Sequence, residues 1–191
     1  MSDQPALSAV APAGSALGPQ EVFDLVARAC PADRHRDQRV LVIVPDGTRT
    51  APVGLLFQAL FEQIGPVARQ VDVIAALGTH QPMTEAQFRE RLEISEAERA
   101  GAYGRVRFFN HEWNNPGALR QIGTIPAAEI AKLTGGLFAM DVPVEINARI
   151  FDYDRLIIIG PVFPHEVVGF SGGNKYLFPD RKSTRLNSSH G

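Results

Sequence analysis

Three polar segments of this 191-residue chain each follow directly on an apolar run, and together they hold residue types suited to proton transfer and anion binding. The segments are residues 45–50, 78–83 and 161–175. Histidine exchanges a proton near neutral pH, and the planar guanidinium of arginine binds carboxylates through two parallel hydrogen bonds. The candidate functional residues in these segments are Asp46, Thr48, Arg49, His80, His165, Ser171 and Lys175.

The same residues also have purely structural interpretations. Asp46-Gly47 is a common turn pair, Arg49 can form a surface ion pair, and a single histidine in a loop is often only solvated. A pair of histidines at one edge of a sheet favours acid–base chemistry more strongly than either histidine does alone.

Residues 169–175 are rich in glycine and end in Lys175, so their backbone N–H groups could cradle a phosphate. The segment is not a P-loop, because Asn174 stands where the last glycine of that motif would be and Tyr176 follows the lysine. A further polar group, His111-Glu-Trp113, follows the third predicted strand. Its composition favours a loop with a partly buried tryptophan.

The elements expected to position these segments alternate between strands and helices. Strands are predicted at the apolar runs 39–44, 71–77, 105–109, 142–147 and 155–160. Helices are predicted from helical spacing or a capping box at 20–30, 51–64, 84–92 and 95–102. This order predicts an α/β fold, Rossmann-like, with a mainly parallel sheet flanked by helices. Because ligands of such sheets bind beyond the carboxyl ends of the strands, the three polar segments are expected to share one rim.

The composition excludes several classes of protein. Nineteen basic residues against 21 acidic ones give a net charge of −2, whereas a dedicated nucleic-acid binder needs a clustered basic surface. The single cysteine, Cys30, excludes an intrachain disulfide and a cysteine-based zinc site. No apolar run approaches the ~20 residues of a membrane-spanning helix, and no signal peptide is recognisable. We therefore expect a cytoplasmic protein that binds neither nucleic acid nor membrane.

The two ends of the chain differ from the rest in composition. Residues 1–18 are rich in Ala, Pro, Ser and Gly, and we expect a flexible lead-in. Residues 180–191 are polar and resemble one reading frame of a sequencing-library adapter, so we expect an artefactual tail. Residues 19–179 are then expected to form one α/β domain.

The three polar segments resemble the N-terminal domain of the nickel-dependent lactate racemase family. The matching motifs are Asp46-Gly-Thr-Arg49, Gly78-Thr-His-Gln-Pro82 and Pro164-His-Glu-Val-Val-Gly-Phe-Ser-Gly-Gly-Asn-Lys-Tyr-Leu-Phe-Pro179, and the likeness runs from about Val40 to Pro179. The resemblance implies an isomerase, a racemase or epimerase of 2-hydroxy acids. Such an enzyme takes hydride from the α-carbon of a small-molecule substrate and returns it to the opposite face.

The resemblance also implies a cofactor and a role for each candidate residue. Family members use a nickel-pincer nucleotide, a nickel pyridinium thioamide/thiocarboxylate mononucleotide, attached covalently to a lysine that matches Lys175. His80 and His165 match the two acid–base histidines. Arg49 matches a substrate-binding arginine, and Asp46 is expected to assist it. The remaining residues expected to bind the cofactor are Thr48, Ser171, Gly172 and Gly173.

The chain departs from the family pattern after Pro179, because Asp180 stands where the family has glycine. The family's histidine ligand for nickel lies downstream of this point, so we assign no metal ligand in this chain. We also expect the family's C-terminal domain, which closes the site, to be missing, and this chain alone to be inactive. An alternative of a different class is a non-catalytic phosphate- or nucleotide-binding α/β module, which would use the glycine-rich segment but neither histidine.

Overall fold

The computed structural model describes residues 6–78, 80–166 and 169–177. The expected tail lies outside the described residues, as do Thr79 of the second motif and Val167, Val168, Phe178 and Pro179 of the third. Residues 6–18 form neither helix nor strand. Within the described part of the chain, no helix combines the length and the apolar character needed to cross a membrane.

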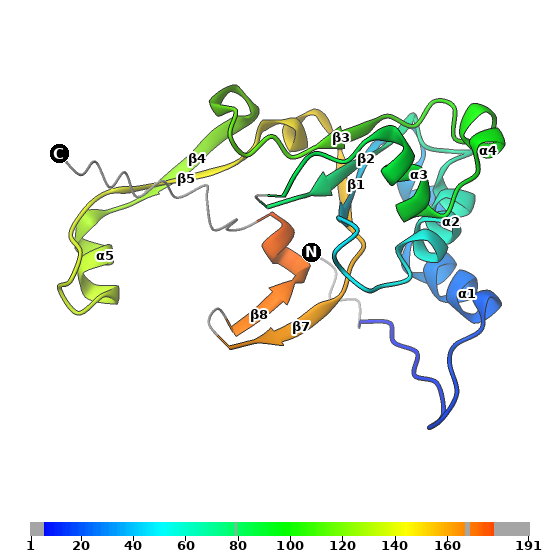
Figure 1. Ribbon diagram of the computed structural model, residues 1–191, viewed down its shortest axis with the longest axis horizontal. Coiled ribbons are helices and arrows are strands. Elements are labelled where there is room, and N and C mark those ends of the chain that lie inside the picture. The colour runs from blue at the N-terminus through cyan, green and yellow to red at the C-terminus, as the bar shows by residue number, and fades with distance from the viewer. Residues whose placement is uncertain (1–5, 79, 167–168, 178–191) are drawn as a thin grey trace.

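A four-stranded parallel sheet forms the centre of the fold (Figure 1). Its strands are β1 (Arg39–Pro45), β2 (Gln70–Ala76), β3 (Phe108–Asn110) and β6 (Arg155–Ile158). The strand order is β3-β2-β1-β6, with Val42 of β1 opposite Val73 of β2 and Ile157 of β6. The central strand β1 is buried from its second residue to its last, which explains its unbroken apolar sequence. The predicted parallel α/β fold is therefore confirmed.

The two faces of the sheet are covered differently. Alternate residues of β1 and β2 pack against helices in the larger core, where Phe57 and Phe88 are fully buried. The smaller cluster on the opposite face centres on Leu41, Ile43 and Ile74. It is covered by two short 3₁₀ helices, η3 (Ala148–Asp152) and η4 (Gly173–Tyr176). The α-helices outside residues 119–147 are α1 (Pro19–Ala29), α2 (Val53–Ile64), α3 (Glu85–Leu92) and α4 (Glu96–Ala100) in the described part of the chain. The connections include η1 (Ala32–His35) and η2 (Pro116–Ala118).

The starts of two helices follow the capping signals of the sequence. The Thr84 hydroxyl accepts a hydrogen bond from the Gln87 N–H, and the Gln87 side chain accepts one from the Thr84 N–H. Ser95 and Glu98 form the same reciprocal pair at the start of α4. The capping box predicted at Thr84 is therefore confirmed, and it fixes where α3 begins after the second polar segment.

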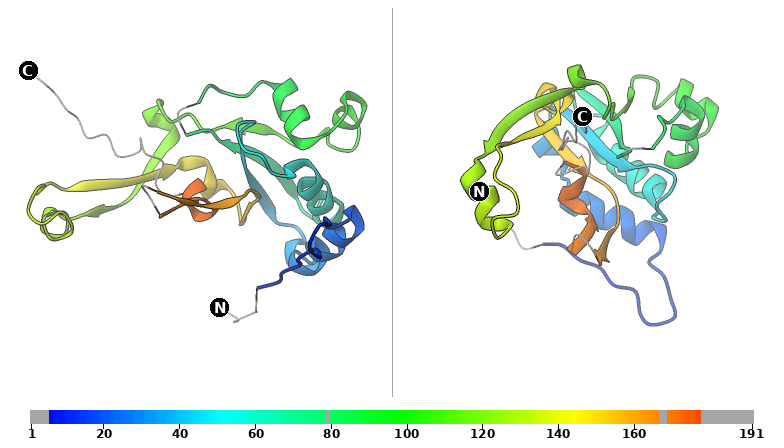
Figure 2. Two further views of the ribbon diagram at one scale, coloured as in Figure 1. Left: turned by 60° about the horizontal axis from the view of Figure 1, so that its bottom comes forward. Right: turned by 60° about the vertical axis from the view of Figure 1, so that its left-hand side comes forward.

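Residues 119–147 form an antiparallel arm that extends away from the helices (Figures 1 and 2). The arm consists of β4 (Leu119–Ile125), α5 (Ala127–Leu133) and β5 (Val142–Asn147). The strand predicted at 142–147 is thus present, but it pairs with β4 and does not join the parallel sheet. Apolar Val142, Val144 and Ile146 alternate along it with Pro143 and Glu145, which is the pattern of a strand with one solvated face.

The third polar segment, expected to be a loop, contains a β-hairpin. Its strands are β7 (Val162–His165) and β8 (Gly169–Gly172). Val162 pairs with Gly172 at the open end, and His165 pairs with Gly169 at the turn end. The helix η4 follows directly and contacts β1, β6 and β8. The open end of the hairpin therefore lies beside the central sheet.

Candidate active site

The turn after β1 holds the Asp46 carboxylate in a fixed position. One carboxylate oxygen, Oδ1, accepts hydrogen bonds from the Thr48 N–H at 3.1 Å and the Thr48 hydroxyl at 2.5 Å. The Arg49 N–H reaches the Asp46 carbonyl at 3.5 Å and closes the turn. Asp46 is only 7% exposed, so its own turn supplies the hydrogen bonds that solvent would otherwise make.

The second carboxylate oxygen of Asp46 contacts Nδ1 of His80. Pro45, the last residue of β1, lies opposite Ala76, the last residue of β2, so the segments that follow the two strands begin side by side. The backbone N–H of His80 donates to the Leu77 carbonyl at 3.0 Å, which folds the second segment back toward Asp46. The structure therefore brings the first two motifs together at the carboxyl ends of the strands, as predicted.

Hydrogen bonds decide the ionisation state of Asp46. Burial acts to raise the pKa of its carboxyl, but hydrogen bonds from Thr48 and His80 outweigh this effect and lower the pKa. A carboxylate that is ionised near neutral pH favours the His80 tautomer with its proton on Nδ1, facing Asp46. The other ring nitrogen, Nε2, is then a proton acceptor, and the His80 side chain is 56% exposed.

Sequence reasoning did not single out Arg91, yet it lies beside this pair. Its Nε donates to the Pro45 carbonyl at 3.3 Å, one residue before Asp46. Burial lowers the pKa of the Arg91 guanidinium, and the nearby charges of Asp46, Tyr176 and Glu93 raise it in part. The sequence feature that could have identified Arg91 was its place in α3, the helix that begins shortly after the second motif.

The third motif reaches the same place through Tyr176 of η4. Tyr176 packs against the smaller core cluster, which consists of Leu41, Ile43 and Ile74. Burial raises the pKa of its hydroxyl, and the charges of Arg49 and Arg91 oppose this rise while Asp46 adds to it. Tyr176 thus places η4, which also carries Lys175, at the end of β1.

The residues expected to bind a cofactor lie in the third motif, except for Thr48 of the first. The Lys175 amine lies 4.7 Å from the centre of the Phe170 ring, and Ser171 lies in β8 opposite Phe163. Gly172 has φ +83°, and a Cβ there would lie 1.9 Å from the Pro161 carbonyl oxygen. Close backbone packing therefore requires this glycine whether or not a ligand is bound. An amine and a hydroxyl on adjoining elements fit a tethered, phosphate-bearing cofactor in chemical type.

His165 lies on a different element from the Asp46–His80 pair. It lies at the turn end of the β7–β8 hairpin, whereas Gly172 and η4 lie at the open end. The hairpin spans four residue pairs, so at about 3.4 Å per residue its two ends are about 10 Å apart. The proposed partnership of His165 with His80 across one substrate therefore stays a prediction.

Two other polar groups are accounted for by the fold. The Asn147 side chain and Nδ1 of His111 are 2.9 Å apart, and Trp113 is half-buried, as expected for a structural loop. Asp72, in the middle of β2, is fully buried and accepts hydrogen bonds from Arg107 and Tyr153. The sequence analysis did not single out Asp72, although a carboxylate inside an apolar strand is itself a signal of a buried polar network.

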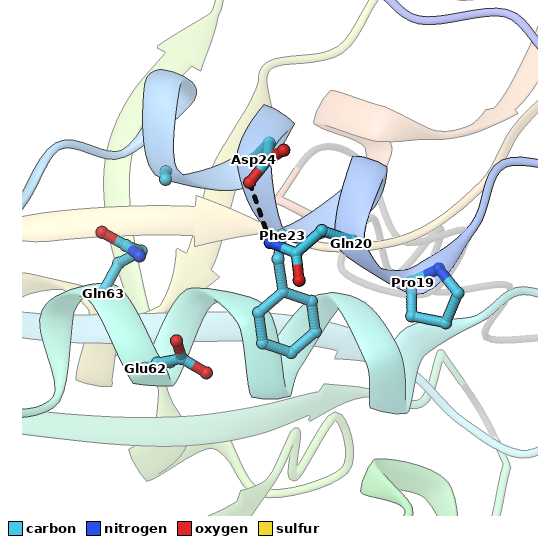
Figure 3. Close-up of a pocket in the computed structure, with 7 residues that line it drawn as sticks. Pro19, Gln20, Phe23, Asp24, Glu62 and Gln63 are labelled. Carbon is cyan, nitrogen blue, oxygen red and sulfur yellow. Dashed lines mark hydrogen bonds between the residues drawn. The ribbon is translucent and has the colours of Figure 1, made fainter.

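A pocket of about 340 Å³ lies elsewhere, between α1 and α2 (Figure 3). Its polar lining includes Asp24 and Glu62, and none of the predicted site residues reaches it. In the described ranges, no cluster of three or more His, Cys, Asp or Glu side chains could hold a metal ion. The Asp46–His80 pair therefore lies at the end of β1 and not in this pocket.

Comparison with known proteins identifies relatives of this chain. The family model for the lactate racemase N-terminal domain matches residues 27–186, including the first part of the expected tail. A lactate racemase from Thermoanaerobacterium thermosaccharolyticum is 28% identical over 148 residues, which are 74% of this chain and 29% of that protein. A crystal structure of a protein from Thermotoga maritima is similar with a TM-score of 0.74 and 32% identity, over 86% of this chain and 38% of that one.

The chain thus spans less than two fifths of the length of either relative. The family model, in contrast, covers most of the chain and includes all three motifs. The chain therefore belongs to the lactate racemase N-terminal domain family.

Proposed function

We propose that this chain is part of a racemase or epimerase of 2-hydroxy acids that uses a nickel-pincer nucleotide. The observation that carries the proposal is the Asp46–His80 pair, which sets a histidine base at the carboxyl ends of β1 and β2. Membership of the lactate racemase N-terminal domain family supports the type of reaction.

The reaction explains why such a base is needed. Inverting the α-carbon of a 2-hydroxy acid requires loss of the hydroxyl proton and of hydride from carbon, which leaves a planar 2-keto acid. Nε2 of His80 accepts the hydroxyl proton and later returns it, because Nδ1 faces Asp46. When bound, the cofactor supplies the hydride acceptor. A second base serves the opposite face of the planar intermediate, and we assign that role to His165 by its place in the third motif.

The substrate carboxylate calls for a cation, and we assign Arg49 to it. Arg49 is exposed in the turn after β1, where its planar guanidinium can form two hydrogen bonds to a carboxylate. Asp46 was expected to bind substrate with it, but its oxygens contact Thr48 and His80. We therefore assign Asp46 to orienting His80, since an anionic side chain would repel the substrate carboxylate.

The residues for holding the cofactor come from the third motif. The Lys175 amine supplies the covalent attachment, and the Ser171 hydroxyl and the N–H groups around Gly173 are suited to its phosphate. Thr48 is the exception among the predicted cofactor residues, because its hydroxyl donates to Asp46 at 2.5 Å. The alternative of a simple phosphate-binding module gives no reason for an oriented histidine, so we favour the racemase.

The proposal is tested on the complete polypeptide that contains this chain, expressed with the enzymes that make the cofactor. We expect nickel-dependent racemisation, followed by optical rotation, of at least one member of a panel of 2-hydroxy acids. His80→Gln should lower turnover by about 10³-fold, while the matched variant His111→Gln retains it. Intact-mass spectrometry should show the cofactor adduct in the parent and its loss in Lys175→Ala. An adduct that persists in Lys175→Ala, or equal loss of turnover in both histidine variants, would contradict the assignment.

The 191-residue chain is expected to show no turnover even when the cofactor is supplied. It covers only 29% of the related lactate racemase, and hydride chemistry needs a site enclosed from water. Turnover by this chain at a rate comparable to that of the complete polypeptide would show that the site lies wholly within it.

A further inference from the structure

Arg91 lies beneath the turn that carries Asp46. It belongs to the last turn of α3, whose neighbouring residues Phe88 and Leu92 are buried in the main core. The helix is therefore anchored on both sides of Arg91, which limits where its side chain can reach. Arg91 lies outside the three polar segments.

The Arg91 side chain is partly buried. Nε donates to the Pro45 carbonyl at 3.3 Å, and Nη2 is buried without a hydrogen-bond partner among the residues that the structure describes. A buried Nη2 is shielded from a substrate in solvent. Arg91 therefore acts on the site through its hydrogen bond to Pro45 and through the interaction of its charge with Asp46.

The surroundings of Asp46 show why a cation matters at this point. The charged or titratable groups near this carboxylate are His80 of the second segment, Arg49 of its own turn, Arg91 of α3 and Tyr176 of η4. His80 is charged only when protonated, and Arg49 is exposed to solvent. Arg91 is thus the permanent positive charge that is partly withdrawn from solvent, and a charge in a region of low dielectric acts more strongly than one in water.

We propose that Arg91 is a positioning residue that holds the Pro45–Asp46 segment and the Asp46 carboxylate in place, and thereby fixes the tautomer and orientation of His80. Its contact with the Pro45 carbonyl fixes the start of the turn. Its charge favours the ionised carboxylate, which keeps the His80 proton on Nδ1. For catalysis the inference rests on the proposed function, but the coupling of Arg91 to His80 is measurable without turnover.

The test is an NMR titration of this chain and of variants at Arg91. Long-range ¹H–¹⁵N spectra report which ring nitrogen of His80 carries the proton, with the signals assigned by comparison with His80→Gln. Carboxyl ¹³C shifts report the titration of Asp46. Arg91→Gln keeps an N–H donor for the Pro45 carbonyl and removes the charge, whereas Arg91→Lys keeps the charge.

In Arg91→Gln we expect the Asp46 carboxyl to titrate at higher pH and the ratio of Nδ1–H to Nε2–H tautomer of His80 to fall several-fold. In Arg91→Lys the Asp46 carboxyl should titrate as it does in the parent. The matched control is Arg89→Met on the same helix, which should change neither signal. Unchanged Asp46 and His80 signals in folded Arg91→Gln would overturn the proposal. If Arg91→Gln does not fold, a clear rise of the Asp46 midpoint in Arg91→Lys overturns it instead.

The complete polypeptide separates this inference from the proposed function. If it racemises a 2-hydroxy acid, the acid limb of its kcat/KM profile should move to higher pH in Arg91→Gln and return in Arg91→Lys. Racemisation with an unmoved profile overturns the role of Arg91 and leaves the proposed function intact. Absence of racemisation in the parent overturns the proposed function, while the NMR titration still decides whether Arg91 positions His80.

Discussion

Two buried carboxylates, one within a strand and one directly after the neighbouring strand, have different hydrogen-bond partners. Asp72 lies within β2, and Asp46 lies directly after β1. Burial acts to raise the pKa of both carboxyls, and hydrogen bonds reverse this and lower both pKa values. The two groups therefore share burial and charge, and differ in the groups that bind them.

The partners of Asp72 tie distant parts of the chain together. Arg107, just before β3, donates to Asp72 from its backbone and from its guanidinium, and the Tyr153 hydroxyl donates at 2.6 Å. Gln70 adds a further hydrogen bond at 2.7 Å. The guanidinium charge is permanent at physiological pH, so this network has one stable state, which suits a structural role.

The partners of Asp46 are local or change their charge. Thr48 belongs to the same turn, and His80 is charged only when it is protonated. The Asp46–His80 pair thus includes a partner without a permanent charge, and one ring nitrogen of His80 faces away from the carboxylate. The comparison shows that the kind of partner, more than burial, distinguishes Asp72 from Asp46, the carboxylate that we propose orients His80.

The largest expected difference between the two carboxylates is in turnover. In the complete polypeptide, Asp46→Asn should lower kcat/KM by about 10³-fold, because an amide no longer holds His80 in the tautomer that leaves Nε2 as a base. Asp72→Asn should lower kcat/KM less than tenfold, measured at a temperature where both variants are folded. Equal losses in the two variants would remove the distinction between them.

For stability we expect the opposite ranking, with Asp72→Asn the more damaging substitution, and both effects are smaller. Asp72→Asn should lower the free energy of unfolding by about 2 kcal/mol, because Arg107 and Tyr153 lose a shared acceptor. The cost is limited because the Arg107 side chain is 61% exposed and regains water. Asp46→Asn should cost less than about 1 kcal/mol, since Thr48 can still donate to the remaining carbonyl oxygen. Urea unfolding followed by circular dichroism gives both values, and a larger loss for Asp46→Asn would contradict this ranking.

Local sequence signals predicted most of the central fold. The β-branched run 39–44 identified the buried strand β1, and Thr84 with Gln87 identified the start of α3. The hairpin β7–β8 escaped prediction because proline and glycine are uncommon in strands and Pro164, Gly169 and Gly172 lie in it. Strand β5 pairs with β4, and even the closest pair, Ile125 and Val142, is 17 residues apart in sequence. A local sequence pattern therefore could not predict this pairing.

The candidate site was predictable to a similar extent. Asp46 and His80 follow adjacent apolar strands, so topology alone predicted that their segments meet. The orientation of Asp46 toward His80 depends on the turn made with Thr48, which a list of residue types does not contain. Arg91 and Arg89 lie two residues apart on one helix, and only tertiary packing decides which of them reaches Pro45.

The smallest expected effect is the acid dependence of stability, where the two carboxylates should act in the same direction. The pKa values of Asp46 and Asp72 are both lower in the folded protein than in model compounds, so the unfolded state binds protons first as the pH falls. Each carboxylate therefore stabilises the fold above its unfolded pKa, which is about 3.9, and this contribution is lost as the pH drops through the lower, folded pKa. Urea unfolding at a series of pH values between about 6 and 3 should show a free energy of unfolding that falls with acidity. Asp72→Asn should flatten this slope more than Asp46→Asn does, since Asp72 accepts more hydrogen bonds from groups that keep their protons throughout. A slope that neither substitution changes would show that other acidic groups control the acid response.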